Sequence, residues 1–303
     1  MSTEIAFDPD IFHGELTANR GQVFVRAGRT AELADCSLHG FVHGPRCEYA
    51  HTLPAKFPLN DLGAGPTLLA RATITDPCYW TSDLPQIYDV HVELRRGGEV
   101  VAREQRMLGL RGIGACPSGE LLREGKVWVP RGVAIELLQT IDMEALREHL
   151  LVGVCAAPPL DLLVEASRRG LYLISEIDAL RQEVPAVLRR LARWPAVMMA
   201  LIRNGETLER SLSQVAPNLL LAQVVEPSQA SSQGSAPWAV AQVIALEAGK
   251  TPQIAAANGS LPRLIRRPAS GRLLSASEAR QECERLQRDL AAAGQFSAYL
   301  LGE

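Results

Sequence analysis

The pattern of apolar and polar residues changes about one third of the way along the chain. Up to about residue 115, short segments alternate apolar and polar side chains, the two-residue period of strands with one buried face. From about Lys126 onward, short continuous apolar runs alternate with stretches of helical period. Strands that alternate with helices form parallel βα units, so the second part predicts a barrel or a doubly wound sheet.

The clearest signal in the first part is a hairpin over residues 87–106. Its first strand would carry one apolar face and one polar face, and the Gly97-Gly98 pair supplies the positive φ angles of a tight turn. Several strands of this kind within about 100 residues predict an immunoglobulin-like β-sandwich over residues 1–118. Nothing in this part has a catalytic pattern, and we expect a structural role for it.

The second part, residues 119–303, predicts a TIM-like barrel with fewer than eight recognisable strands. Helices are expected at Val184–Arg193, at Trp238–Ala248 and at Ser275–Gly294, the last with a Ser275–Glu278 capping box. Seven strands can be counted, one short of an ordinary barrel, at 127–132, 150–155, 171–175, 196–202, 219–225, 253–257 and 296–301.

The stretch Trp194–Glu206 is the most informative in this part. Its unbroken apolar run, Ala196–Ile202, is typical of a strand buried on both faces. Arg203, Asn204 and Glu206 follow the run, and active sites of barrels are built at the carboxyl ends of strands. Four further polar residues follow other predicted strands and are candidates for the same site: Glu176, Asp178, Glu226 and Asn258.

Charge and composition exclude some classes of function. The net charge of −3 gives no electrostatic case for binding nucleic acid or an anionic membrane. No apolar run approaches the roughly 20 residues of a membrane helix, and the start lacks a signal-peptide pattern, so we expect a cytoplasmic protein. No strand is followed by a glycine-rich phosphate loop, and no cofactor is expected. Nothing indicates an oligomeric state.

One cluster has the residue types of a zinc site: Cys36, His39, His43, Cys47 and His51. Gly40, Gly44 and Pro45 interrupt any helix there, so the five side chains would not share a helical face. We therefore expect no metal.

The motifs along residues 65–206 resemble those of glycoside hydrolase family 2, the β-galactosidases, β-glucuronidases and β-mannosidases. The resemblance rests on their order: Trp80, Pro85 with Tyr88, the hairpin, Gly109 with Arg111, Lys126–Gly132, Ala166–Glu176 and Trp194–Asn204. It implies a sandwich followed by a barrel whose strand ends bind carbohydrate, with Asn204 at a substrate-binding position.

Two departures from the family pattern concern its catalytic carboxylates. Aligning Pro195 and Asn204 puts Gly205 at the acid/base position, with Glu206 one residue late. The resemblance also puts Ala257 at the nucleophile position, within the segment Thr251–Gly259.

Retaining hydrolysis needs both carboxyl groups. We therefore expect a family 2-like protein without this activity, a pseudoenzyme that serves as a carbohydrate-binding or interaction module. The alternative is an active glycosidase with a relocated pair, Glu206 with Glu176 or Glu226. A third reading is a scaffold whose cleft is closed by side chains such as Met198 or Arg203.

Overall fold

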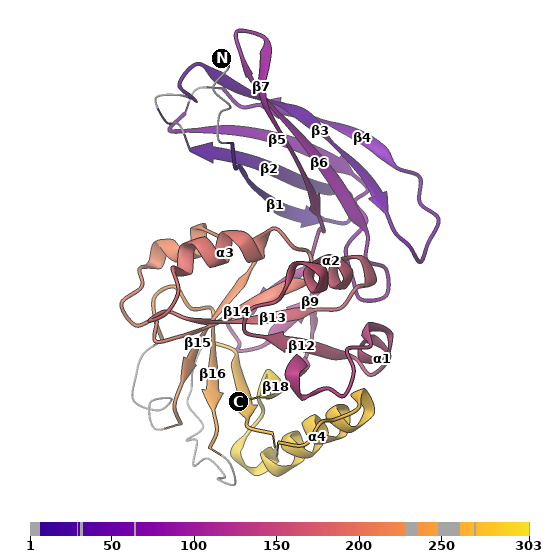
Figure 1. The fold of residues 1–303 in the computed structure, drawn as a ribbon, viewed down its shortest axis with the longest axis vertical. Coiled ribbons are helices and arrows are strands. Elements are labelled where there is room, and N and C mark those ends of the chain that lie inside the picture. Colours follow the sequence, from indigo (N-terminus) through magenta and orange to yellow (C-terminus); the bar gives the residue numbers. More distant parts are fainter. Residues whose placement is uncertain are drawn as a thin grey trace. The chain divides into compact units, whose positions relative to one another are not determined.

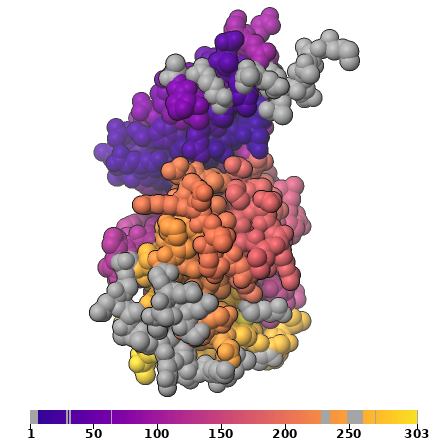
Figure 2. All heavy atoms as spheres, turned by 90° about the vertical axis from the view of Figure 1, so that its left-hand side faces the viewer, coloured from indigo at the N-terminus to yellow at the C-terminus, as the bar shows by residue number. Residues whose placement is uncertain are grey.

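The computed structural model describes residues 7–28, 30, 33–63, 65–227, 235–247, 261–269 and 271–302. Its contacts divide the chain into two units: Met1–Arg111 with Arg193–Pro195, and Gly112–Ala192 with Ala196–Glu303. Figure 2 shows them as filled atoms, the first unit indigo to purple and the second magenta to yellow. The boundary at residue 118 stays a prediction.

The first unit is a curled antiparallel sheet of seven strands in the order β1-β2-β5-β4-β3-β6-β7 (Figure 1). The strands are β1 (Asp10–Thr17), β2 (Arg20–Gly28), β3 (Cys36–Arg46), β4 (Ala55–Asp61), β5 (Thr67–Thr75), β6 (Ile87–Arg96) and β7 (Glu99–Leu108).

Both halves of this sheet contribute to one core. Val23 and Val25 of β2 are fully buried in it together with Val90 and Leu94 of β6. The alternation seen in the sequence thus gives each strand one inner and one outer face, and the predicted β-sandwich is confirmed. The predicted hairpin is β6 and β7, with both turn glycines at positive φ.

The second unit is a closed barrel of eight parallel strands, so the predicted TIM-like barrel is confirmed. Its strands are β11 (Arg131–Ala134), β12 (Leu151–Cys155), β13 (Leu173–Asp178), β14 (Val197–Arg203), β15 (Leu220–Val225), β16 (Ala241–Ala245), β17 (Arg263–Arg267) and β18 (Ala298–Leu301). β11 pairs with β18 and closes the ring. A small antiparallel sheet precedes the barrel: β8 (Ile113–Ala115), β9 (Leu121–Arg123) and β10 (Lys126–Val127).

Helices cover the outside of the barrel (Figure 1). The α-helices are α1 (Met143–Glu148), α2 (Leu160–Arg169), α3 (Val184–Ala192) and α4 (Ala276–Asp289), and the 3₁₀ turns are η2 (Ile135–Leu137), η3 (Arg210–Gln214) and η4 (Ala291–Ala293). The predicted capping box of Ser275 and Glu278 begins α4. Gly170 ends α2 in the left-handed conformation that a C-cap glycine adopts.

Three expectations about the barrel need correction. Trp238–Ala248 is not a helix, because β16 occupies Ala241–Ala245. A strand buried on both faces has no alternation, so its apolar run resembles that of a buried helix. The single predicted strand over 127–132 is two short ones, β10 and β11, in different sheets.

The third correction is the number of strands, eight and not seven. The predicted strand at 253–257 lies outside the described residues, and the seventh strand of the barrel is β17. β17 contains only two apolar residues, Leu264 and Ile265, between arginines, which is too short a run to predict a strand.

None of the described helices has the length and apolar composition needed to cross a membrane. The candidate zinc cluster begins on β3, where Cys36 is buried and His39 lies on the outer face. In the described part of the chain, no group of three or more His, Cys, Asp or Glu side chains could hold a metal ion.

Replacing Ser275 with alanine should destabilise the barrel unit by about 1 kcal/mol, the usual contribution of a helix N-cap. The Ser275 hydroxyl accepts from the backbone N–H of Glu278, whose carboxylate accepts from the backbone N–H of Ser275. Urea denaturation followed by circular dichroism measures the loss. Ser213→Ala, at an exposed serine of η3, is the control and should leave the transition unchanged.

Candidate functional site at the carboxyl ends of the barrel strands

Three barrel strands bring the polar candidates to one end of the barrel. β13 ends with Glu176 and Asp178, and β14 ends with Arg203, directly before Asn204. β17 contributes Arg266, which is 4% exposed. All strands of the barrel are parallel, so these carboxyl-terminal positions meet at the same rim.

The centre of the site is an ion pair between Glu176 and Arg266. Arg266 donates from Nη1 to Glu176 Oε2 at 3.0 Å, and its Nη2 lies 2.8 Å from Oε1. In the closed ring, β13 and β17 are four strands apart in either direction, so they face each other across the barrel. The ion pair therefore spans the barrel interior and engages both carboxylate oxygens.

Low exposure makes this pair different from a surface salt bridge. The side chains of Arg266 and Glu176 are 5% and 18% exposed. Arg203 adds a second, more distant cation, with its Nη2 3.9 Å from Glu176 Oε2. A paired charge in such surroundings is costly to unpair, because the remaining partner would be left buried and uncompensated.

Asp178 and Asn204 form a second polar pair at the rim. Asn204 donates from Nδ2 to Asp178 Oδ1 at 2.9 Å, and the backbone N–H of Leu180 donates to the same oxygen at 3.1 Å. The hydrogen bond from Asn204 is the main cause that lowers the pKa of Asp178 below its ordinary value, followed by the bond from Leu180. Asn204 has a φ of 57°, a conformation that asparagine tolerates better than most residues.

In the variant Asn204→Gly, the pKa of Asp178 should rise toward its ordinary value. Glycine keeps the positive φ and removes only the amide that donates to the carboxylate. A lowered pKa in the folded state means that this bond stabilises the fold above the pKa of an unfolded aspartate, and the contribution is lost as the pH falls through the lowered value. Carboxyl ¹³C NMR titration measures the change, and an unaltered Asp178 titration would contradict it. Glu278, whose pKa is lowered by its own cap, should not respond.

Gly205 is buried beneath Trp238. The indole Nε1 of Trp238 donates to the Gly205 carbonyl at 3.0 Å. A Cβ on Gly205 would lie 2.9 Å from Ile202 Cγ2 and 2.9 Å from Trp238 Cζ2. The position that resembles the acid/base site therefore lacks room even for a methyl group.

The remaining candidates are exposed or lie outside the described residues. Glu206 and Glu226 are both exposed, and among the described residues no hydrogen bond or ion pair joins Glu206 to another candidate. Ala257 and Asn258 lie outside the described residues. Cys155, at the end of β12, has a pKa raised mainly by burial and further by the charges of Glu136 and Glu176, which keeps its thiol protonated.

Sequence reasoning missed two residues that shape the site, Arg266 and Trp238. Arg266 belongs to a strand that the apolar pattern did not reveal, although three arginines within five residues mark the segment. Trp238 was assigned to the start of a helix. It is 1% exposed, and it also binds the backbone at Gly205.

Comparison with known proteins supports the architecture and not the chemistry. No protein-family model matches the sequence, and no curated protein matches it at a significant level. A glycosyl hydrolase family 2 member from Bacteroides cellulosilyticus DSM 14838 superposes with a TM-score of 0.64 at 15% identity, covering 97% of this chain and 45% of that one.

Two β-glucuronidase structures are similar to the same degree. That from Bacteroides uniformis gives a TM-score of 0.63 at 14% identity, over 96% of this chain and 45% of that one. The structure from Bifidobacterium dentium, complexed with coumarin-3-O-glucuronide, gives a TM-score of 0.64 at 13% identity, over 97% of this chain and 59% of that one. The chain thus spans roughly half the length of these three proteins. It has a glycoside hydrolase family 2-like fold, a β-sandwich followed by an eight-stranded barrel.

Proposed function

We propose that this protein has lost retaining glycosidase activity and binds carbohydrate at the polar rim of its barrel. The observation that carries the proposal is the ion pair of Glu176 and Arg266 across the barrel interior. Retaining hydrolysis requires two carboxyl groups ~5–5.5 Å apart, one to attack and one to exchange a proton. Arg266 engages both oxygens of Glu176, which argues against either role for this carboxylate.

The order of the strands supports the same proposal. The resemblance to family 2 implies two further strands between the acid/base strand and the nucleophile strand. Here β15 and β16 lie between β14 and β17, so this order puts the nucleophile position at the end of β17 and not at Ala257, which lies outside the described residues. That strand ends in Arg266 and Arg267, and an arginine cannot form a covalent glycosyl intermediate.

The rim retains groups that suit sugar hydroxyls. Arg203 is 51% exposed, and beside it Asp178 and Asn204 hold each other in place. Carboxylate, amide and guanidinium groups together offer acceptors and donors in fixed planes, which is how polar groups orient a ligand in a largely preformed site.

The alternative function is an active glycosidase that uses Glu206 with Glu176 or Glu226. It requires a carboxylate pair ~5–5.5 Å apart for retention or ~6.5–9.5 Å apart for inversion. The pairing of Glu176 with Arg266 argues against the first combination. An interaction scaffold is the other candidate, favoured by the ion pair that occupies the barrel interior.

Hydrolysis of a panel of p-nitrophenyl β-glycosides separates these functions. We expect release of nitrophenol at the rate of the buffer alone. Turnover that Glu206→Gln abolishes and Glu209→Gln leaves intact would establish the glycosidase instead; Glu209 is an exposed neighbour whose carboxylate accepts a hydrogen bond from Ser211.

Binding is tested in parallel by calorimetry with neutral β-linked oligosaccharides. We expect binding that weakens in Asp178→Asn and in Arg203→Gln. Absence of both turnover and binding would favour the scaffold.

A further inference from the structure

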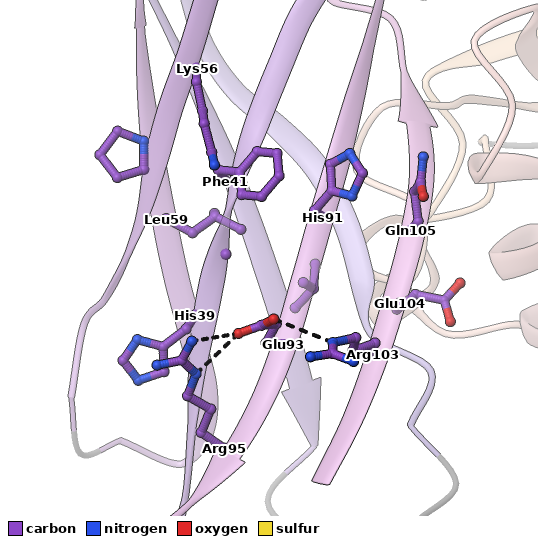
Figure 3. Close-up of a pocket in the computed structure, with 13 residues that line it drawn as sticks. His39, Phe41, Lys56, Leu59, His91, Glu93, Arg95, Arg103, Glu104 and Gln105 are labelled. Atoms are coloured by element: carbon purple, nitrogen blue, oxygen red, sulfur yellow. Dashed lines mark hydrogen bonds and ion pairs between the residues drawn. The ribbon is translucent and has the colours of Figure 1, made fainter. Parts of the chain in front are cut away.

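A groove of about 1020 Å³ lies on the outer face of the sandwich, away from the core (Figure 3). It crosses β4, β3, β6 and β7. Its volume is at the upper end of the ~300–1,000 Å³ typical of ligand sites. None of its lining residues belongs to the barrel, so it is separate from the site described above.

The strand register arranges the side chains of the groove in two rows across the sheet. Phe41 of β3 pairs with His91 of β6, which pairs with Gln105 of β7. The second row lies two residues further along each strand and consists of His39, Glu93 and Arg103. Two residues of strand span about 7 Å, which is the spacing of the two rows, and the part of the groove between them is called the slot. Figure 3 shows the two rows.

Between the two rows, β3 has Gly40, which pairs with Val92 of β6. Gly40 has a φ of 140°, and a Cβ there would lie 1.9 Å from the backbone oxygen of His91. Only glycine fits this position, because it lets β3 and β6 approach closely between the two rows.

The first row presents an aromatic surface and a cation. The rings of Phe41 and His91 stack with centroids 4.5 Å apart, and Lys56 Nζ lies 3.6 Å from the centroid of Phe41. Among the described residues, no carboxylate lies within ion-pair distance of Lys56. Its positive charge therefore lies against an aromatic ring, with no counterion in the part of the chain that the structure describes.

The second row holds Glu93 rigidly between two arginines. Arg95 Nη2 donates to Glu93 Oε2 at 2.6 Å, and Arg103 Nε donates to Oε1 at 3.3 Å. The hydrogen bond from Arg95 is the main cause that lowers the pKa of Glu93, so the carboxylate stays charged. The guanidinium groups keep free N–H donors for a ligand, because each arginine has five and spends at most two here.

The charge of the groove favours an anion. Lys56, Arg95 and Arg103 carry positive charges, and Glu93 is the carboxylate within the two rows; Glu104 alternates to the other side of β7, where it pairs with Arg106 at 2.8 Å. The lining therefore has a positive excess, concentrated at Lys56 and at the exposed Arg103.

The position of the groove within the sheet favours a sugar over a peptide. β3 and β6 are paired on both sides, so their backbone groups are satisfied and cannot add a peptide strand. Recognition must come from side chains, and the slot offers a ring surface with planar donors and acceptors on either side. These groups suit the faces and hydroxyls of pyranose rings.

We propose that this groove binds a carboxylate-bearing oligosaccharide, with a sugar ring in the slot between the two rows and a carboxylate directed to Lys56. The site lies in the unit for which the sequence indicated only a structural role. It does not depend on whether the barrel binds or cleaves a sugar.

Calorimetry of the full chain with trigalacturonic acid tests the proposal. The fully methyl-esterified trisaccharide, which has the same rings without charge, should bind more weakly. Lys56→Met should weaken binding of the acid about five- to tenfold, the effect of one charge contact at a partly exposed site, and change binding of the ester little. Phe41→Ala should weaken both ligands. Arg20→Gln removes an equal charge on β2, outside the groove, and is the matched control.

Each other outcome overturns the proposal. Equal affinity for the acid and the ester would show that the carboxylate does not contribute to binding. A triglutamate peptide that competes as well as the sugar acid would show that the groove binds peptides. No binding by the wild type at millimolar ligand also refutes it. Asp178→Asn, in the barrel, should leave this binding unchanged. The proposal for the groove and the proposal for the barrel rim are therefore tested independently.

Discussion

Glu176→Gln is expected to lower the free energy of unfolding of the barrel by about 3–5 kcal/mol, the range measured when one partner of a buried ion pair is removed. Glutamine keeps the shape of the side chain and removes its charge, which leaves the guanidinium of Arg266 uncompensated across the barrel interior. The geometry limits rescue by water, because Arg266 is almost fully buried. Urea denaturation followed by tryptophan fluorescence measures the loss, and Trp128 and Trp238 report on the barrel unit.

The double variant Glu176→Gln/Arg266→Met separates charge from packing. Removing both charges should destabilise less than the sum of the single changes, because neither group is then left alone. Glu165→Gln is the matched control: its carboxylate lies 3.1 Å from Arg169 on α2, and both side chains are 43% exposed. That change should cost no more than about 0.5 kcal/mol. Equal losses of unfolding free energy in Glu176→Gln and Glu165→Gln would show that the ion pair across the barrel stabilises the fold no more than a surface ion pair does.

Gly205→Glu, which inserts the acid that the family pattern has at this position, should not produce a glycosidase. It should also destabilise the barrel by about 2 kcal/mol or more, because overpacking a filled site typically costs 1–3 kcal/mol. The new side chain would have to displace Ile202, Leu208 or the indole of Trp238. Release of nitrophenol from aryl β-glycosides and urea denaturation are the two measurements.

Gly28→Ala provides the control for the added side chain. A Cβ at Gly28 would meet no heavy atom within 4 Å, so this change should leave stability within about 0.5 kcal/mol. Turnover in Gly205→Glu that exceeds the wild type would contradict the expectation and show that the strand end can still present an acid to a sugar.

Much of the architecture was predictable because it depends on local periodicity. The buried face of β6 and the Gly97-Gly98 turn were readable as a hairpin, since strand alternation and turn glycines act within a few residues. The capping box of α4 was readable for the same reason. Strands β16 and β17 were missed, one because its apolar run also fits a helix and one because it holds only two apolar residues.

The candidate site was predictable only in its outline. Polar residues after apolar strands indicated that Glu176, Asp178 and Asn204 would meet at one rim, and the hydrogen bond between Asn204 and Asp178 agrees with that expectation. Their roles stay predictions. The partner of Glu176 could not be foreseen, because Arg266 is 90 residues away along the chain and on the opposite strand of the barrel.

The sequence alone thus specifies the inner and outer faces of the sandwich strands, the succession of strands and helices, and the helix caps, because each follows from neighbours a few residues apart. Closure of the barrel decided the rest. It brought Arg266 to Glu176 and Trp238 to Gly205, and the sheet register aligned two distant rows into a groove on the sandwich. These pairings depend on distances between strands far apart in the chain, which no local pattern encodes.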